Sequence, residues 1–384
     1  DNCTLGGLLL AVAAVVKHHD VTNARHSNDM WSQNPLTERL NLDWPILQAP
    51  MGRLVTPALA AAVSNAGGLG GLGMLGFSAE DAERRIAGFR QQSGGSVNVS
   101  YPLWDNPGDI SSKGMAMRAK VQELYDDKGL GPIPTPEPSA SNIDPGHLDV
   151  LQRTKPEVIS FHFGLPAPNI MQTLKASGIF IISSATTVAE ARALEDQGAD
   201  AVIAQGTEAG GHRGTFTGVD ISMQPGLFAL LPQVVDAVSV PVIAAGGVSD
   251  GRTVAAAFML GASAVQLGTA FLRCEEAAVP DVHRAALGGS EDANTIVTEL
   301  ISGLPARYIK NELIDELSKS DDEALPFPAQ LELVYPLTST GDHNVSALFS
   351  GQSASLTKER TATDLVQSLA AETNQRLKAF HGNN

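Results

Sequence analysis

Eight short apolar segments recur along this chain, and helix-patterned segments separate most of them. Most of these segments are rich in Val, Ile, Leu and Ala, which is typical of strands that are buried on both faces. They span residues 45–49, 69–73, 96–99, 157–161, 179–183, 201–205, 241–245 and 264–268. Strands that alternate with helices predict parallel βαβ units. Eight such units predict an α/β fold of the TIM-like (β/α)8 barrel type.

Helix signals fit this alternation. Segment 58–66 is rich in Ala and is followed by Gly67. Segment 188–197 is rich in Ala, Glu and Arg and is followed by Gly198. Glycine is the residue type that most often ends a helix. A third helix is expected after Asp250, with its end at Gly261.

The rest of the chain departs from the pattern. Residues 129–146 contain five prolines and predict an irregular surface loop. Strand signals stop near residue 270, and residues 281–319 and 357–380 look helical, joined by the Pro-rich 325–336. We therefore predict that residues 30–272 form the barrel and that residues 273–384 form a C-terminal helical lobe that covers its site.

Residues 1–29 do not resemble the rest of the chain. An apolar run over 5–16 leads into a polar stretch, and Met30 looks like a natural start. A secretory signal is one interpretation, but no basic region or initiator methionine precedes the apolar run. We interpret residues 1–29 as an N-terminal extension of doubtful origin.

Charge and cysteine content limit the possible partners. The 26 basic and 42 acidic residues give a formal net charge of −16, which disfavours nucleic-acid binding because phosphates are repelled. No apolar run reaches the roughly 18 residues that a transmembrane helix needs, so no membrane role is expected. Cys3 and Cys274 lack metal-ligand spacing. We therefore predict neither a disulfide framework nor a metal site, and a cytoplasmic location.

Two glycine-containing turns follow the last two predicted strands, Gly246-Gly247 and Gly268-Thr269. Barrel enzymes often bind phosphate at this place, where backbone N–H groups and a helix N-terminus converge. Glycine lets the backbone approach the phosphate closely, and Thr269 adds a hydroxyl donor. A tight turn without a ligand is the alternative, and we predict a phosphate site.

Side-chain amides lie near the ends of other predicted strands. Asn98, Gln205 and Gln266 can each donate and accept hydrogen bonds, as the edge of a flavin ring requires. The run Gln48–Gly52 ends the first strand, and its backbone could lie against a ring system. Each amide could instead be a satisfied core group, but their common position favours a ligand.

Two of the nine histidines are candidates for chemistry. His212 follows the sixth predicted strand and is flanked by Gly210, Gly211 and Gly214, which leave it accessible. We predict that His212 is catalytic or binds substrate. His162 ends the fourth predicted strand, where a structural imidazole and a substrate contact are equally consistent with the sequence.

These motifs together resemble the nitronate monooxygenase family, formerly called 2-nitropropane dioxygenases, over residues 36–360. The resemblance rests on six segments in family order. They are Ala49-Pro50-Met51-Gly52, Ser64-Asn65-Ala66-Gly67-Gly68-Leu69-Gly70, Ser160-Phe161-His162-Phe163-Gly164, Glu208-Ala209-Gly210-Gly211-His212, Ala245-Gly246-Gly247 and Gln266-Leu267-Gly268-Thr269. Each segment alone is weak, whereas their order is specific.

The resemblance implies a barrel with FMN at its mouth and His212 as the active-site histidine. It also implies that the segment 349–353 helps to close the pocket. The implied FMN contacts are Asn98, Gln205, Gly210, Gly247, Gln266, Leu267, Gly268 and Thr269, with Met51, Ser184 and Gly246 as further neighbours.

The activity that the resemblance implies is FMN-dependent oxidation of alkyl nitronates, such as propionate 3-nitronate, by O₂ to a carbonyl compound and nitrite. An FMN- and NAD(P)H-dependent enoyl-acyl carrier protein reductase resembles the chain in fewer segments and is the first alternative. A flavin-binding barrel without turnover is the second. A homodimer is possible, and the chain length of the substrate is left open.

Overall fold

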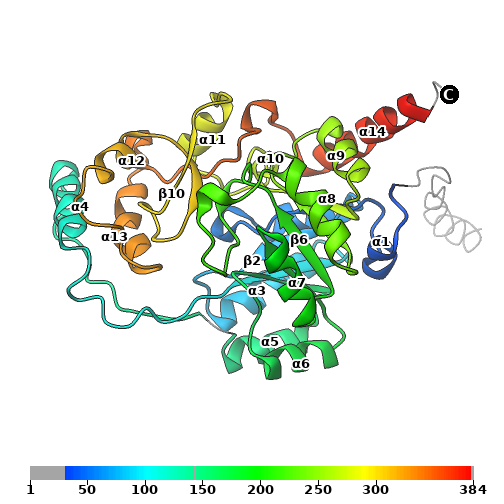
Figure 1. Ribbon diagram of the computed structural model, residues 1–384, viewed down its shortest axis with the longest axis horizontal. Helices are drawn as coiled ribbons and strands as arrows, with labels where there is room; N and C mark the ends of the chain where they lie inside the picture. Colours follow the sequence, from blue (N-terminus) through cyan, green and yellow to red (C-terminus); the bar gives the residue numbers. More distant parts are fainter. Residues whose placement is uncertain (1–30, 142, 382–384) are drawn as a thin grey trace, which may run out of the picture.

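The computed structural model describes residues 31–141 and 143–381, and its centre is a barrel of eight parallel strands (Figure 1). The strands neighbour one another in the order β1-β9-β8-β6-β5-β4-β3-β2. A parallel bridge between Leu47 and Leu69 joins β1 to β2 and closes the ring. The barrel strands are β1 (Ile46–Gln48), β2 (Gly70–Gly73), β3 (Val97–Pro102), β4 (Val158–His162), β5 (Phe180–Ala185), β6 (Ala201–Gln205), β8 (Val242–Ala245) and β9 (Ala264–Leu267). Each predicted segment contains or overlaps one of them, so the predicted barrel is confirmed.

The barrel interior changes from apolar to polar along its axis. Toward the beginnings of most strands, side chains at alternate positions form one buried apolar cluster. Leu36 and Leu40 of α1 (Pro35–Leu40) belong to the same cluster, so α1 covers the end of the barrel opposite its mouth. The strand residues of that cluster are Leu47, Leu69, Val158, Ile182, Ala201, Ile203, Ile243, Ala245 and Ala264. Further along the same inward-facing rows, the residues are polar: Ser100, Ser160, His162, Ser184, Gln205 and Gln266. A polar layer is therefore built into the mouth.

Helices surround the barrel, and local sequence explains where they begin. Thr56, Thr187 and Asp250 cap α2, α7 and α9 with side-chain oxygens that accept backbone N–H groups. The predicted stops Gly67, Gly198 and Gly261 each adopt a positive φ just after these helices. The surrounding helices are α2 (Pro57–Asn65), α3 (Ala79–Arg90), α5 (Pro145–Thr154), α6 (Pro168–Ala176), α7 (Val188–Asp196), α8 (Leu227–Ala237) and α9 (Gly251–Met259).

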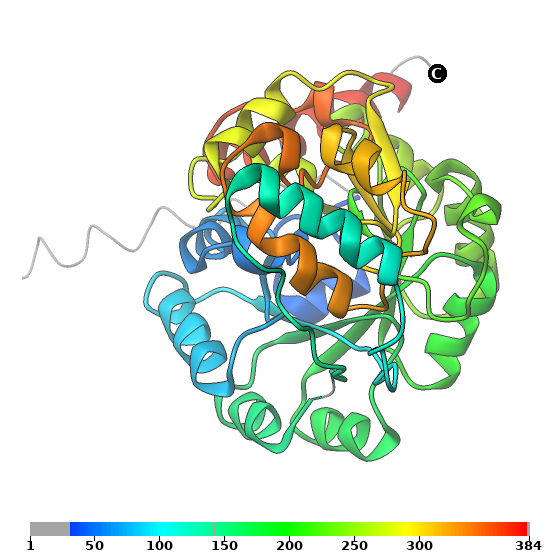
Figure 2. The same ribbon diagram turned by 90° about the vertical axis from the view of Figure 1, so that its left-hand side faces the viewer.

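A separate lobe lies across the mouth of the barrel, and two distant parts of the chain build it (Figure 2). One part is α4 (Met115–Lys128), which follows β3. The other part contains α12 (Glu312–Leu317) and α13 (Ala329–Thr338), which both pack against α4. The Tyr125 hydroxyl donates to the Leu333 carbonyl at 2.7 Å across this contact. The lobe therefore has its own buried core, to which residues before 273 contribute.

The prediction of helix throughout 281–319 is wrong in its middle. After α11 (Asp281–Gly288), the chain forms an antiparallel hairpin of β10 (Thr295–Thr298) and β11 (Ala306–Ile309). The β-branched run Thr-Ile-Val-Thr favours a strand, and Gly303 and Pro305 prevent a continuous helix. The hairpin also pairs with β7 (Gly211–His212) from the barrel.

The last described helix packs on the barrel rather than in the lobe. Helix α14 (Ala362–His381) packs against α9 and α2, in agreement with the helix predicted over 357–380. The short helix α10 (Thr269–Leu272) and four 3₁₀ turns complete the described elements: Gly52–Leu54, Ile221–Met223, His343–Val345 and Ala354–Leu356. In the described ranges, no helix combines the length and hydropathy that crossing a bilayer requires. The predicted extension over 1–29 lies outside the described residues.

Candidate functional site

The backbone of His212 is held by both the barrel and the lobe. His212 and Gly211 form the two-residue strand β7, which pairs antiparallel with Ala306 and Arg307 of β11. From the barrel, the Gln205 side chain donates to the His212 carbonyl at 3.0 Å and accepts from the Gly214 N–H at 2.8 Å. His212 is therefore fixed where the lobe meets the polar mouth of the barrel.

The His212 ring lies in an apolar environment with one polar contact. Its Nε2 is 2.9 Å from the Oγ of Ser302. The rings of Phe163, Phe327 and Phe349 surround it, with centroids 5.7–6.1 Å away. Burial, and next the neighbouring His162, lower the pKa of His212 from 6.5 to about 3. The imidazole is therefore neutral at ordinary pH and can donate at one nitrogen and accept at the other.

His162 supports His212 from the barrel side. Its Nε2 is 3.1 Å from the His212 carbonyl oxygen, so this nitrogen must carry the proton. Its Nδ1 is 3.1 Å from the Ser184 hydroxyl and therefore accepts from it. Burial lowers the pKa of His162 to about 4, although its bond to the His212 carbonyl opposes the shift. Both ring nitrogens are thus engaged within the protein.

Three polar atoms on the inward-facing rows of the barrel strands are buried and have no hydrogen-bond partner within residues 31–141 and 143–381. They are Asn98 Oδ1, Ser160 Oγ and Gln266 Oε1. A buried polar atom without a partner costs about 1–3 kcal/mol. The two amide oxygens only accept, and the Ser160 hydroxyl can donate or accept. These atoms therefore fit a polar ligand that presents N–H or O–H groups to the amide oxygens.

Glycines open the wall beside β8 and β9. Gly246 and Gly247 adopt φ values of +108° and +69°, which few other residues tolerate. Gly268 precedes α10, and a methyl group placed on it would be 3.5 Å from the Met51 sulfur. The phosphate site expected at this wall stays a prediction, and glycines at these positions leave its backbone N–H groups open to approach.

The segment 349–353 closes the wall from the lobe side. The Gly351 N–H donates to the Thr269 hydroxyl at 2.9 Å, and the Gln352 N–H donates to the Glu208 carbonyl at 3.0 Å. Gly210 is essential to this contact, because a methyl group there would lie 2.5 Å from the Gly351 nitrogen. The segment and the predicted turn at 208–212 are therefore in direct contact.

Comparison with known proteins identifies the family. Residues 33–372 match the family model described as nitronate monooxygenase. The chain belongs to this family. Accordingly, it is an enzyme of the flavin-dependent oxidoreductase class.

Relatives and solved structures agree with this assignment. A probable nitronate monooxygenase of Staphylococcus aureus (strain MSSA476) is 37% identical over 355 residues, which cover 90% of this chain and 99% of the relative. The nitroalkane oxidase from Streptomyces ansochromogenes has a TM-score of 0.81 and 36% identity, with 90% of this chain and 99% of that chain covered. FabK from Thermotoga maritima has a TM-score of 0.71 and 29% identity, with 92% and 99% covered.

The structure brings most of the predicted site residues of this member of the nitronate monooxygenase family together, but not all of them. His212, His162, Ser184 and Gln205 form one hydrogen-bonded cluster. Gly210 and Thr269 meet at the segment 349–353, and Met51 adjoins Gly268. Leu267 contributes its backbone only, because its side chain is buried in the core. Asn98 lies near the start of β3 rather than its end, because β3 continues to Pro102.

Three neighbours of the candidate site were not predicted from the sequence. Ser302 lies 90 residues from His212, in a stretch expected to be helical. Glu190 is fully buried and accepts from Thr186, Thr215, Phe216 and Thr217, which ties the turn after His212 to α7. Arg213 is buried and donates to the carbonyls of Gln205 and Gly206. A threonine-rich turn after a glycine-flanked histidine could have suggested a buried acidic partner for that turn.

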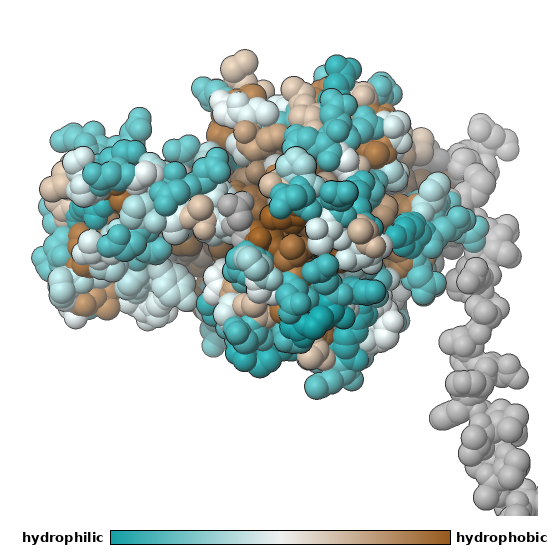
Figure 3. Space-filling view, turned by 90° about the horizontal axis from the view of Figure 1, so that it is seen from below, coloured by the Kyte–Doolittle hydropathy of each residue, from teal (hydrophilic) through white to brown (hydrophobic). Residues whose placement is uncertain are grey.

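The surface offers two other features. Seen from below, the molecule has an apolar hollow near the middle of this face, framed by hydrophilic residues (Figure 3).

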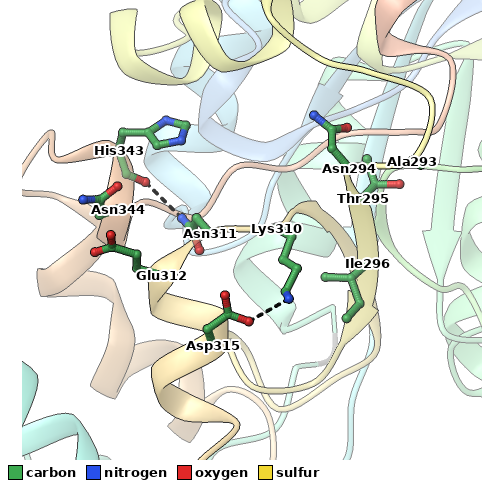
Figure 4. A pocket seen from close by; sticks show the side chains of 10 residues that line it. All are labelled: Ala293, Asn294, Thr295, Ile296, Lys310, Asn311, Glu312, Asp315, His343 and Asn344. Atoms are coloured by element: carbon green, nitrogen blue, oxygen red, sulfur yellow. Dashed lines mark hydrogen bonds and ion pairs between the residues drawn. The ribbon is translucent and has the colours of Figure 1, made fainter.

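The lobe carries a pocket of ≈ 470 Å³ on its β10–α12 side (Figure 4). There Lys310 pairs with Asp315 at 2.8 Å, and Asn311 donates to the His343 carbonyl at 3.0 Å. These polar groups of the pocket thus satisfy one another, and none of its residues belongs to the His212 cluster.

Proposed function

We propose that this protein is an FMN-dependent nitronate monooxygenase that oxidises alkyl nitronates with O₂ to carbonyl compounds and nitrite. The observation that carries the proposal is the position of His212. Its neutral ring lies at the barrel mouth, above a polar layer with three unpartnered atoms and beside a glycine-lined wall. This combination suits a flavin phosphate ester together with a small organic substrate.

FMN would be held by two parts of the site. Backbone N–H groups of Gly246, Gly247, Gly268 and Thr269 would hold the phosphate. Asn98, Ser160 and Gln266 would meet the polar edge of the ring with atoms that lack a partner among the described residues. When bound, FMN supplies the redox chemistry that no side chain of the chain can supply.

His212 would orient the nitro group, and the three phenylalanines would exclude water from it. The ring can take the Cα proton when a neutral nitroalkane binds, and the N–H formed in this way can donate to an oxygen of the nitronate. Phe163, Phe327 and Phe349 would pack against the alkyl part of the substrate. The substrate class is therefore alkyl nitronates.

The first test is nitrite release from purified, FMN-loaded protein that is mixed with ethylnitronate or propionate 3-nitronate in air, without NADH. We expect nitrite in proportion to the O₂ consumed. Mass spectrometry of the flavin that heat releases identifies FMN. A yellow, folded protein that releases no nitrite would refute the proposal and favour an NAD(P)H-dependent enoyl reductase, which the addition of NADPH and an enoyl thioester then tests.

The second test is His212→Asn. This variant keeps a side chain that can hydrogen-bond but removes the imidazole, so we expect FMN to remain bound while turnover falls by about two orders of magnitude. Flavin absorbance verifies the first expectation, and nitrite release verifies the second. Unchanged turnover would remove His212 from the mechanism.

A further inference from the structure

Ser302 is the only side chain with a hydrogen bond to the His212 ring within the described residues. It is fully buried in the turn between β10 and β11. Two N–H groups fix this turn, because those of Ser302 and Gly303 both donate to the Glu299 carbonyl, at 3.2 Å and 2.7 Å. The backbone that carries the Ser302 side chain is therefore held in place, and the Ser302 Oγ lies 2.9 Å from His212 Nε2.

The hydrogen bonds around Ser302 determine which nitrogen of His212 carries the proton. The Ser302 hydroxyl donates to the Leu304 carbonyl at 3.2 Å, and the Tyr308 hydroxyl donates to Ser302 Oγ at 3.5 Å. With its own proton directed at Leu304, Ser302 can only accept from His212. The proton of the neutral ring is then on Nε2, and every donor in the group has an acceptor.

The other nitrogen, Nδ1, has no hydrogen-bond partner in the part of the chain that the structure describes, whereas Nε2 is engaged. A neutral imidazole with its proton on Nε2 has a lone pair on Nδ1. Phe163, Phe327 and Phe349 keep this ring in one orientation. The nitrogen that remains for a substrate is thus an acceptor.

We propose that Ser302 is a positioning residue that holds His212 as the Nε2–H tautomer and leaves Nδ1 to accept the Cα proton of a neutral nitroalkane. In this step the Cα–H bond breaks, its electron pair moves into the nitro group to give the nitronate, and an N–H bond forms at Nδ1. The imidazolium keeps its Nε2–H bond to Ser302, and the nitronate charge beside it stabilises the cation. The inference rests on the proposed function and adds the residue that decides which nitrogen of His212 takes the proton.

The test compares nitroethane, which must lose a proton, with ethylnitronate, which has already lost it. We expect Ser302→Ala to lower the ratio of kcat/KM for nitroethane to that for ethylnitronate by at least tenfold. Ser302→Thr keeps the hydroxyl and should restore most of this ratio. Ser346→Ala is the matched control, because Ser346 is another buried serine of the lobe that donates to a backbone carbonyl but does not contact His212.

A second measurement does not depend on turnover. Nitrogen-15 NMR of histidine-labelled, FMN-loaded protein distinguishes a protonated from an unprotonated ring nitrogen, and His212→Asn assigns the signal. We expect a protonated Nε2 in the wild type and a mixture of tautomers in Ser302→Ala. A wild-type ring protonated on Nδ1, or equal losses on both substrates, would overturn the proposal. If the wild type oxidised neither substrate, the proposed function would fail, while the NMR result would still decide the role of Ser302.

Discussion

At the scale of single residues, the pair His162 and His212 links the site to the stability of the fold. Burial lowers the pKa of both rings, to about 4 and about 3 respectively. In the unfolded chain a histidine has a pKa of about 6.5. As the pH falls below 6.5, the unfolded state therefore takes up protons that the folded state does not, and stability is lost in this window.

This linkage predicts a smaller acid sensitivity for His212→Asn than for the wild type. A ring that stays neutral in the fold contributes a loss of about 2 kcal/mol between pH 6.5 and pH 5, and the variant lacks this loss for one of the two rings. Guanidinium unfolding of both proteins at pH 7.5 and pH 5 measures the difference. The same loss in both proteins would show that His212 is protonated in the folded state.

The sequence predicts which residues gather at the candidate site better than it predicts which of them interact. His212 is predicted because glycines around a histidine are poor packing and good access, which is a local signal. Ser302 is not predictable in this way, because its contact with His212 spans 90 positions and depends on a hairpin. Glu190 lies on a predicted helix, and only the folded structure brings the turn at 215–217 onto its carboxylate.

At the scale of elements, the segment 349–353 contacts the turn at 208–212 beside the phosphate site that we propose at Gly246, Gly247, Gly268 and Thr269. Gly210→Ala tests this contact, because its methyl group would lie 2.5 Å from the Gly351 nitrogen and 2.6 Å from the Ser350 carbonyl carbon. Both are backbone atoms, so the segment has to move.

We expect Gly210→Ala to weaken FMN binding by at least tenfold, which is about 1.4 kcal/mol. Quenching of flavin fluorescence on titration measures the affinity. Gly94→Ala is the matched control, because Gly94 is exposed and a methyl group there meets nothing within 4 Å. Equal affinity in the two variants would mean that the segment does not help to hold the flavin.

The elements themselves are predicted well in the barrel and less well in the lobe. Barrel strands are apolar runs between glycine-ended helices, so local pattern and tertiary position agree. In the lobe, Thr295–Thr298 is only half buried and becomes a strand because β11 pairs with it. The contribution of α4 to the lobe was also not predictable, since it depends on packing between residues 208 positions apart, as in the bond from Tyr125 to Leu333.

At the scale of the whole molecule, the formal charge of −16 opposes the approach of an anionic substrate. Two buried arginines lie near the site, but carboxylates offset them. Arg213 and Arg307 donate to the carbonyls of residues 205–207, next to the turn that leads to His212. Glu208 interacts electrostatically with both arginines, and buried Glu190 interacts with Arg213. The acidic surface is therefore the charge that an approaching anion meets.

Salt tests this effect, because it screens exposed charges over about 10 Å at 0.1 M. We expect kcat/KM for ethylnitronate to rise by about two- to threefold between about 10 and 200 mM NaCl, because repulsion by the surface is screened. Propionate 3-nitronate carries a second negative charge and should show a larger rise. Neutral nitroethane is the control and should not respond. A fall in kcat/KM with salt for the two anions would instead mean that positive potential at the mouth dominates the encounter, and that the acidic surface faces away from the path by which substrate reaches His212.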